Sequence, residues 1–246
     1  MAFLCCDIMS EVMDMTTSVR VILPDKGRLS ETNVVYLLHG RSDNSSNWTR
    51  FSSVERYAAE KGLAVVMPEV QRSFYTNMKN GLPYFNYISE ELPEICRRIF
   101  SFSNKREKNY IMGLSMGGYG ALKCALTYPD RYMGVGSFSG VTDISRWIGN
   151  SIGTGYDKEL AAIFGNDLTV PNEDDLFLLL DEAGNDLPDI YLSCGEQDSL
   201  YDDSVRFDSA LTKRNFTHRF DHRDGIHDWA FWDRSVKDCF DFFFPA

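Results

Sequence analysis

The sequence has no hydrophobic run long enough to cross a membrane and no excess of basic residues. No apolar stretch approaches the roughly 20 residues that a transmembrane helix requires. Acidic residues outnumber basic ones by 36 to 25, which gives a formal net charge of −11. Because such a surface repels phosphate backbones and anionic lipids, we expect neither a nucleic acid nor a membrane as a partner.

Motifs for metals, nucleotides and secretion are also missing. The six cysteines are scattered without a Cys-x-x-Cys pair, and we interpret them as reduced, mostly buried thiols. No phosphate loop, dinucleotide fingerprint or metal-ligand motif occurs, so no metal and no organic cofactor is indicated. The first residues, Met1–Asp7, lack the basic region and full apolar core of a signal peptide. The sequence therefore favours a cytoplasmic protein.

What the sequence does contain is a Gly-x-Ser-x-Gly motif, Gly113–Gly117, centred on Ser115. The apolar residues Tyr110–Leu114 predict a short strand before Ser115, and a helix is predicted to begin at Met116. A serine lifted clear of a sheet needs a strained turn, and glycines on both sides avoid backbone clashes. The backbone N–H of Met116 would lie at a helix N-terminus, where it can stabilise an oxyanion. This pattern predicts a nucleophilic serine at residue 115.

Strand and helix patterns alternate along most of the chain. Such alternation is typical of an α/β fold, with a mostly parallel central sheet and helices on both faces. The segment 141–187 interrupts the alternation, and we interpret it as a small lid insertion within one domain that spans residues 1–246. Strands are predicted at 18–23, 34–38, 63–67, 110–114, 131–138, 189–194 and 217–221, and helices at 53–61, 88–99, 205–213 and 229–243, besides the one that begins at 116.

Four histidines are available as the base that a serine nucleophile requires. Sites in parallel sheets form at the carboxyl ends of the strands. His227 lies after the last predicted strand and before the last helix, where it can reach Ser115, and His222 is the weaker alternative. His39 lies in a His-Gly turn and is interpreted as holding that loop by hydrogen bonding, while His218 falls inside a strand.

The acid that orients the base is expected between the serine and the histidine in chain order. Asp198 follows the penultimate predicted strand and is therefore the favoured residue. Glu196, Asp202 and Asp203 are its rivals, although we interpret all three as parts of a solvated acidic loop. Ser139 is a second serine at a strand end, but it lacks the flanking glycine pattern and is interpreted as structural support.

The loop after the strand at 34–38 should supply the second oxyanion donor. Its candidate is the backbone N–H of Arg41, which leaves the Arg41 side chain free to meet substrate or solvent. Aromatic residues could line an acyl or alcohol pocket, although such residues more often pack in the core. The substrate-binding candidates are Trp48, Tyr75, Trp147 and Trp229, with Phe74 and Tyr84 as further aromatic residues of this kind.

Taken together, several segments resemble the putative-esterase family of α/β-hydrolases. The similarity extends from Ser10 to Phe243 and is strongest to the bacterial tributyrin esterases. The family also includes esterase D (S-formylglutathione hydrolase), feruloyl and acetyl-xylan esterases, and the mycolyltransferases. The segments that carry the resemblance are His39-Gly40 with the loop to Trp48, residues 72–77, residues 113–120, residues 194–198 and residues 227–229.

The resemblance implies an α/β-hydrolase fold with Ser115, Asp198 and His227 as a catalytic triad, and with Arg41 and Met116 as oxyanion donors. It implies a serine carboxylesterase that hydrolyses short-chain acyl esters of small molecules without a cofactor, and it leaves a homo-oligomer open. Cleavage of a thioester and of acetyl or feruloyl groups on polysaccharides are alternatives. A hydrolase-fold protein that binds without turnover is an alternative of a different class.

Overall fold

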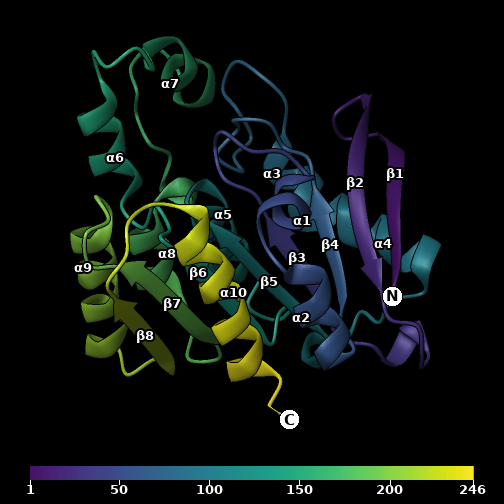
Figure 1. Cartoon of the computed structure of the whole chain (residues 1–246). Coiled ribbons are helices and arrows are strands. Elements are labelled where there is room, and N and C mark those ends of the chain that lie inside the picture. Colours follow the sequence, from purple (N-terminus) through teal and green to yellow (C-terminus); the bar gives the residue numbers. More distant parts are fainter. Residues whose placement is uncertain (246) are drawn as a thin grey trace.

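The apolar runs of the sequence form an eight-stranded sheet in the computed structural model, which describes residues 1–245 (Figure 1). The strand order is β1-β2-β4-β3-β5-β6-β7-β8, and all pairs from β4 to β8 are parallel. The expected mostly parallel α/β sheet is thus confirmed. The strands are β1 (Ala2–Ser10), β2 (Met15–Leu23), β3 (Val34–Leu38), β4 (Ala64–Pro68), β5 (Asn109–Leu114), β6 (Gly134–Phe138), β7 (Asp189–Gly195) and β8 (His218–Arg223).

Helices cover both faces of the sheet, and two apolar clusters fill the space beneath them. In β3 the side chains alternate: Val34, Tyr36 and Leu38 belong to one cluster, and Val35 and Leu37 belong to the other. This period of two explains why the central strands are apolar throughout. No helix within residues 1–245 has the length and apolar character needed to span a membrane.

One cluster is covered by helices α1 (Asn47–Phe51), α2 (Val54–Lys61) and α10 (Trp229–Phe243). Those on the other face are α3 (Tyr84–Asn86), α4 (Leu92–Phe100), α5 (Met116–Thr127), α6 (Ile144–Ser151), α7 (Asp157–Phe164), α8 (Leu176–Glu182) and α9 (Tyr201–Lys213). Short helical turns, η1 to η4, occur at Leu29–Glu31, Tyr87–Glu91, Arg106–Lys108 and Asn172–Asp174.

Of the N-terminal hairpin, the strand predicted at 18–23 lies within β2, whereas β1 was not predicted. Residues of β1 pair antiparallel with β2 along their full length, from Ala2 opposite Leu23 to Ser10 opposite Met15. Strand β1 lies at the outer edge of the sheet, and its side chains are mostly exposed or half-buried. Because no buried apolar face marks it, the pattern of hydrophobic residues gave no strand signal there.

One predicted strand is shorter than expected, and one predicted helix changes its hydrogen-bonding pattern. Strand β6 begins at Gly134, because Arg131 still belongs to the preceding turn. The predicted helix at 88–99 is helical throughout, first as the π-helical η2 and from Leu92 as α4. Pro93 lies in the first turn as expected and has no N–H, and the carbonyl of Ser89, which an ordinary helix would bond to residue 93, accepts from Arg131 Nη1 at 2.7 Å instead.

Residues 141–187, which we interpret as an insertion, form the short helices α6, α7, η4 and α8, and this segment is anchored to α5. The Lys123 ammonium of α5 forms a fully buried ion pair with Asp174 of η4. The Tyr119 hydroxyl donates to the Asp174 carbonyl at 2.7 Å. The first half of the insertion, with α6 and α7, projects beyond the ends of the strands (Figure 1).

Candidate active site

Ser115 occupies a strained turn between β5 and α5. Its φ of 52° and ψ of −117° lie outside the regions that L-residues ordinarily adopt. Its N–H donates to the Phe138 carbonyl at 2.8 Å, and its carbonyl accepts from Tyr119 N and Val141 N at 3.1 and 3.3 Å. Neighbouring backbone from β6, α5 and the loop after β6 thus fixes this conformation, which raises the side chain above the sheet.

The glycines around Ser115 are required by close backbone contacts. A Cβ on Gly117 would lie 2.5 Å from the Leu38 carbonyl oxygen and 2.7 Å from that of His39. A Cβ on Gly113 would lie 2.3 Å from the Gly117 carbonyl oxygen. Because real Cβ contacts are never this short, the motif is what allows α5 to begin directly against β3 and its following loop.

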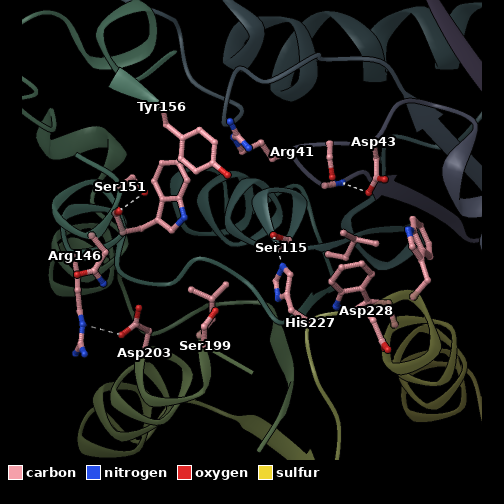
Figure 2. Close-up of a pocket in the computed structure, with 18 residues that line it drawn as sticks. Arg41, Asp43, Ser115, Arg146, Ser151, Tyr156, Ser199, Asp203, His227 and Asp228 are labelled. Carbon is pink, nitrogen blue, oxygen red and sulfur yellow. Dashed lines mark hydrogen bonds and ion pairs between the residues drawn. The ribbon is translucent and has the colours of Figure 1, made fainter. Parts of the chain in front are cut away.

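The structure brings Ser115, His227 and Asp198 into one hydrogen-bonded chain, and Figure 2 shows the bond between Ser115 and His227. The distance from Ser115 Oγ to His227 Nε2 is 3.0 Å, and from His227 Nδ1 to Asp198 Oδ2 it is 2.8 Å. The second carboxylate oxygen of Asp198 accepts from Leu200 N at 2.9 Å. With Asp198 ionised, Nδ1 of His227 donates to it, so that Nε2 is free to accept the serine proton.

The environment of Asp198 keeps its carboxylate charged. Its side chain is fully buried, and burial alone would raise its pKa. The hydrogen bond and charge of His227, together with the Leu200 N–H, outweigh that effect and lower the pKa below its ordinary value. A buried, ionised carboxylate at this place can both orient the imidazole and stabilise its protonated form.

The loop after β3 is held by His39 from beneath. His39 Nε2 accepts from Val70 N at 3.2 Å, and its Nδ1 donates to the Gly40 carbonyl at 2.8 Å. Burial lowers the pKa of His39, which favours the neutral ring that these two bonds require. The structure therefore agrees with the interpretation of His39 as a support of the loop.

Two backbone N–H groups adjoin the serine without an acceptor of their own. Arg41 lies in a turn in which Asp43 N donates to the Gly40 carbonyl at 3.1 Å, and Met116 directly follows Ser115. Within residues 1–245, no hydrogen bond uses the N–H of Arg41 or of Met116. Such N–H groups beside a nucleophile can receive a developing oxyanion.

A cleft of about 680 Å³ opens above Ser115. Of the four aromatic candidates, Trp147 and Trp229 line it. Lining residues that sequence reasoning missed include Tyr156 and Trp232, whose indole packs edge-on against His227 at 4.8 Å. Tyr156 lies in the insertion, where no motif marks it, whereas Trp232 could have been found one helical turn after Trp229.

The other two aromatic candidates do not line the cleft, and that expectation is corrected. Trp48 is fully buried behind Trp229, and its indole N–H donates to the Leu38 carbonyl at 3.1 Å. Tyr75 is also fully buried, and its hydroxyl donates to the His39 carbonyl at 2.9 Å. Both are large rings that fill the core beneath the site, so they support it without facing a substrate.

The alternative histidines pair with carboxylates other than Asp198, and the interpretation of Asp203 has to be corrected. His222 pairs with Glu196 at 2.9 Å on the surface, and His218 pairs with Asp208 at 3.0 Å. Asp203 is not part of a solvated loop as interpreted from the sequence. It is buried at the edge of the cleft.

Asp203 is buried because two arginines neutralise it. Arg206 Nη2 lies 3.0 Å from its Oδ1, and Arg146 Nε lies 3.6 Å from the same oxygen. Ser139, the second serine at a strand end, is fully buried, and its N–H donates to the Ser193 carbonyl at 2.7 Å. No hydrogen bond within the described chain joins Ser139 to His227, which agrees with a structural role.

The Arg41 side chain is not free, in contrast to the expectation. Its Nε and Nη2 donate to the two carboxylate oxygens of Glu159 at 2.5 and 2.6 Å. Its guanidinium also lies 3.9 Å from the centre of the Tyr156 ring. Burial by itself would lower the pKa of Arg41, but the bonds to Glu159 and the charge of that carboxylate raise it.

Comparisons with known proteins find similar chains. The family model described as putative esterase matches residues 10–241. The acetyl esterase of Caldicellulosiruptor saccharolyticus is 28% identical over 261 residues, covering 98% of this chain and 97% of that protein. Structures of two Staphylococcus aureus proteins are also similar. The fluorophosphonate-binding serine hydrolase FphF is 34% identical with a TM-score of 0.92, and the match covers 100% of this chain and 99% of that one. The S-formylglutathione hydrolase FrmB is 34% identical with a TM-score of 0.89, and the match covers 99% of each chain.

Gly117→Ala tests whether the close contact at the start of α5 determines activity. We expect the added Cβ to push α5 away from Leu38 and His39, lowering ester turnover at least about tenfold and the free energy of unfolding by about 1–3 kcal/mol. Gly149→Ala is the matched control, because a Cβ there meets open space within α6. Equal effects of the two substitutions would contradict this account.

Asp198→Asn tests the lowered pKa of Asp198 through the pH dependence of stability. Since the pKa is lower in the folded state, the ionised carboxylate stabilises the fold above its unfolded pKa of about 4, and this contribution is lost as the pH falls through the folded pKa. Urea unfolding should show the largest difference between wild type and variant near pH 7 and a shrinking difference below about pH 4. Asp202→Asn, at an exposed position, is the control for removing one negative charge. A difference for Asp198→Asn that is independent of pH would refute the shift.

Proposed function

This chain belongs to the putative esterase family and is a carboxylic ester hydrolase, and we propose that it hydrolyses short-chain acyl esters through Ser115, His227 and Asp198. The observation that carries the proposal is the chain of hydrogen bonds from Ser115 Oγ to His227 at 3.0 Å and from His227 to Asp198 at 2.8 Å. A serine hydroxyl becomes an effective nucleophile when such a base and orienting acid stand behind it.

The proposed reaction has two stages, acylation and deacylation of Ser115, which are separated by an acyl-enzyme. His227 Nε2 removes the hydroxyl proton as Ser115 Oγ attacks the ester carbonyl, and the charged imidazole is stabilised by Asp198. The N–H groups of Met116 and Arg41 stabilise the negative charge on the former carbonyl oxygen. His227 then protonates the departing alcohol, which leaves an acyl group on Ser115. Water, deprotonated by His227, attacks this acyl-enzyme, and His227 returns the proton to Ser115 Oγ as the acid leaves.

The lining of the cleft supports an acyl group, and the similarity to an acetyl esterase supports a short one. Leu114, Trp229 and Trp232 line the cleft beside the serine, and Trp229 and Trp232 pack edge-on at 5.5 Å. The fully buried Trp48 packs behind Trp229 at 5.1 Å, so aromatic rings back this apolar wall. Residues 141–187 supply the opposite, more polar wall through Arg146, Trp147, Asn150, Ser151 and Tyr156, and we interpret this insertion as the lid.

The charges around the cleft favour a neutral ester over an anionic substrate. In the described part of the chain, both arginines that line the cleft are paired, Arg41 with Glu159 and Arg146 with Asp203. The lining acids Asp43 and Asp228 add negative charge. A thioester with free carboxylates would therefore find no unpaired cation there. Thioester cleavage is nevertheless the second candidate, because FrmB, an S-formylglutathione hydrolase, is 34% identical over nearly the whole chain.

Ser115→Ala tests the nucleophile, and the wild-type rates on three esters test the acyl preference. We expect wild-type kcat/KM to fall from p-nitrophenyl acetate and butyrate to octanoate, and the variant to lose at least about a thousandfold on all three. Ser139→Ala should retain far more activity than Ser115→Ala, because Ser139 is buried without contact to the base. Full activity in Ser115→Ala would exclude the proposed nucleophile, and a wild type inactive on all three esters would exclude the esterase proposal.

The second candidate is tested by comparing two acyl donors on the same enzyme. We expect kcat/KM for p-nitrophenyl acetate to exceed that for S-formylglutathione, because the paired arginines offer no site for the glutathione carboxylates. The measurement is the ratio of the two constants at low and high salt, with Ser115→Ala as the blank. A ratio in favour of the thioester would make the second candidate the better description.

A further inference from the structure

The insertion contacts the loop after β3 at one residue, Arg41. This loop is called the oxyanion loop below, because the Arg41 N–H is the proposed second oxyanion donor. Arg41 and Glu159 are 118 positions apart, yet they form two parallel hydrogen bonds of 2.5 and 2.6 Å, with side chains that are only 18% and 15% exposed. A bidentate pair of this kind fixes direction as well as distance. Tyr156, at the start of α7, places its ring 3.9 Å from the same guanidinium. Figure 2 shows Arg41 and Tyr156 next to each other above Ser115.

Helix α7 has its own attachment, so it can serve as a fixed point for Arg41. At its C-terminal end, Lys79 N and Asn80 N donate to the carbonyls of Ile163 and Ala162, both at 2.9 Å. Leu160 and Ile163 are buried in the core. Glu159 therefore projects from a helix that is held independently of the oxyanion loop.

The peptide that carries the Arg41 N–H, in contrast, is held by hydrogen bonds at only one end. Its carbonyl, that of Gly40, accepts from Asp43 N at 3.1 Å and from His39 Nδ1 at 2.8 Å. Within residues 1–245, no hydrogen bond uses the carbonyl of Arg41 itself. The other end of this peptide, the Arg41 Cα, is therefore fixed through the Arg41 side chain, and the direction of the N–H depends on both ends.

We propose that Glu159 is a positioning residue, which acts through the Arg41 side chain to keep the Arg41 backbone N–H directed at the oxyanion. The inference rests on the proposed function, in which that N–H is the second oxyanion donor. Tyr156 assists by stacking on the guanidinium, so that this part of the insertion completes the catalytic geometry besides lining the cleft. Glu159 itself does not line the cleft.

This role predicts a specific kinetic effect. An oxyanion donor acts mainly in the transition state, so a misdirected Arg41 N–H lowers kcat and leaves KM nearly unchanged. We expect Glu159→Ala to lower kcat by about tenfold to a hundredfold, which is less than the loss of a whole donor. Glu159→Gln retains one acceptor for the guanidinium and should show a smaller loss. Binding of a trifluoromethyl ketone, which forms an oxyanion adduct with the serine, should weaken by the same factor as kcat/KM.

The decisive experiment is a double-mutant cycle with Arg41→Ala, measured with p-nitrophenyl acetate. Arg41→Ala keeps the backbone N–H but removes the anchor, so adding Glu159→Ala to it should lower kcat no further. Lys158→Ala, an exposed neighbour on α7, is the matched control and should keep wild-type kcat. Thermal unfolding of each variant verifies that it is folded. If Glu159→Ala does not fold, the same measurements are made with Glu159→Gln.

Three results would overturn the inference: a kcat for Glu159→Ala within twofold of wild type, an effect confined to KM, or losses that multiply in the double variant. These results are distinguishable from failure of the proposed function. A wild type without Ser115-dependent ester turnover removes the proposed function, whereas an active, Ser115-dependent wild type with an unaffected Glu159→Ala removes only the positioning role.

Discussion

The strained backbone at Ser115 is the constraint on which the rest of the site depends. A φ of 52° at a non-glycine residue costs free energy, and it is maintained because the N–H and the carbonyl of Ser115 are both engaged by neighbouring backbone. The glycines at 113 and 117 allow that backbone to come close enough. Since the same turn starts α5, it also sets the position of the Met116 N–H. The Ser115 side chain and the Met116 N–H, which are the proposed nucleophile and the proposed first oxyanion donor, are therefore positioned by one local conformation.

Two histidines show how burial and partners separate supporting and reacting roles. His39 is almost fully buried, and both of its ring nitrogens form hydrogen bonds with backbone groups. Neither nitrogen is therefore available for proton transfer to a substrate. His227 is partly exposed, with a carboxylate on one nitrogen and a hydroxyl on the other. A ring in the second environment can gain and lose a proton during a reaction, whereas a ring in the first can only hold a loop.

The sequence predicted the parts of the molecule that follow from local rules. The Gly-x-Ser-x-Gly motif located the turn at Ser115, and the position of His227 after the last strand brought it to the serine. Buried apolar runs located the central strands, while the exposed edge strand β1 carried no such signal. Asp203 pairs with Arg206 of its own helix α9, but its burial, which escaped prediction, also depends on Arg146 of α6. The anchoring of Arg41 escaped prediction because its charged partner lies on another element. For Arg41 that partner is 118 residues away.

Helix α5 connects these local and distant features. Gly117 lets its start approach Leu38 and the loop after β3, and Gly120 lets the ring of Tyr75 pack against it, since a Cβ there would lie 2.4 Å from that ring. One turn further on, Lys123 pairs with Asp174 of the insertion. Burial lowers the pKa of Lys123 and the carboxylate of Asp174 opposes that effect, so the pair constrains geometry more surely than it adds stability. A single helix thereby begins directly after Ser115, the proposed nucleophile, and contacts both the loop after β3 and the segment 141–187 along its length.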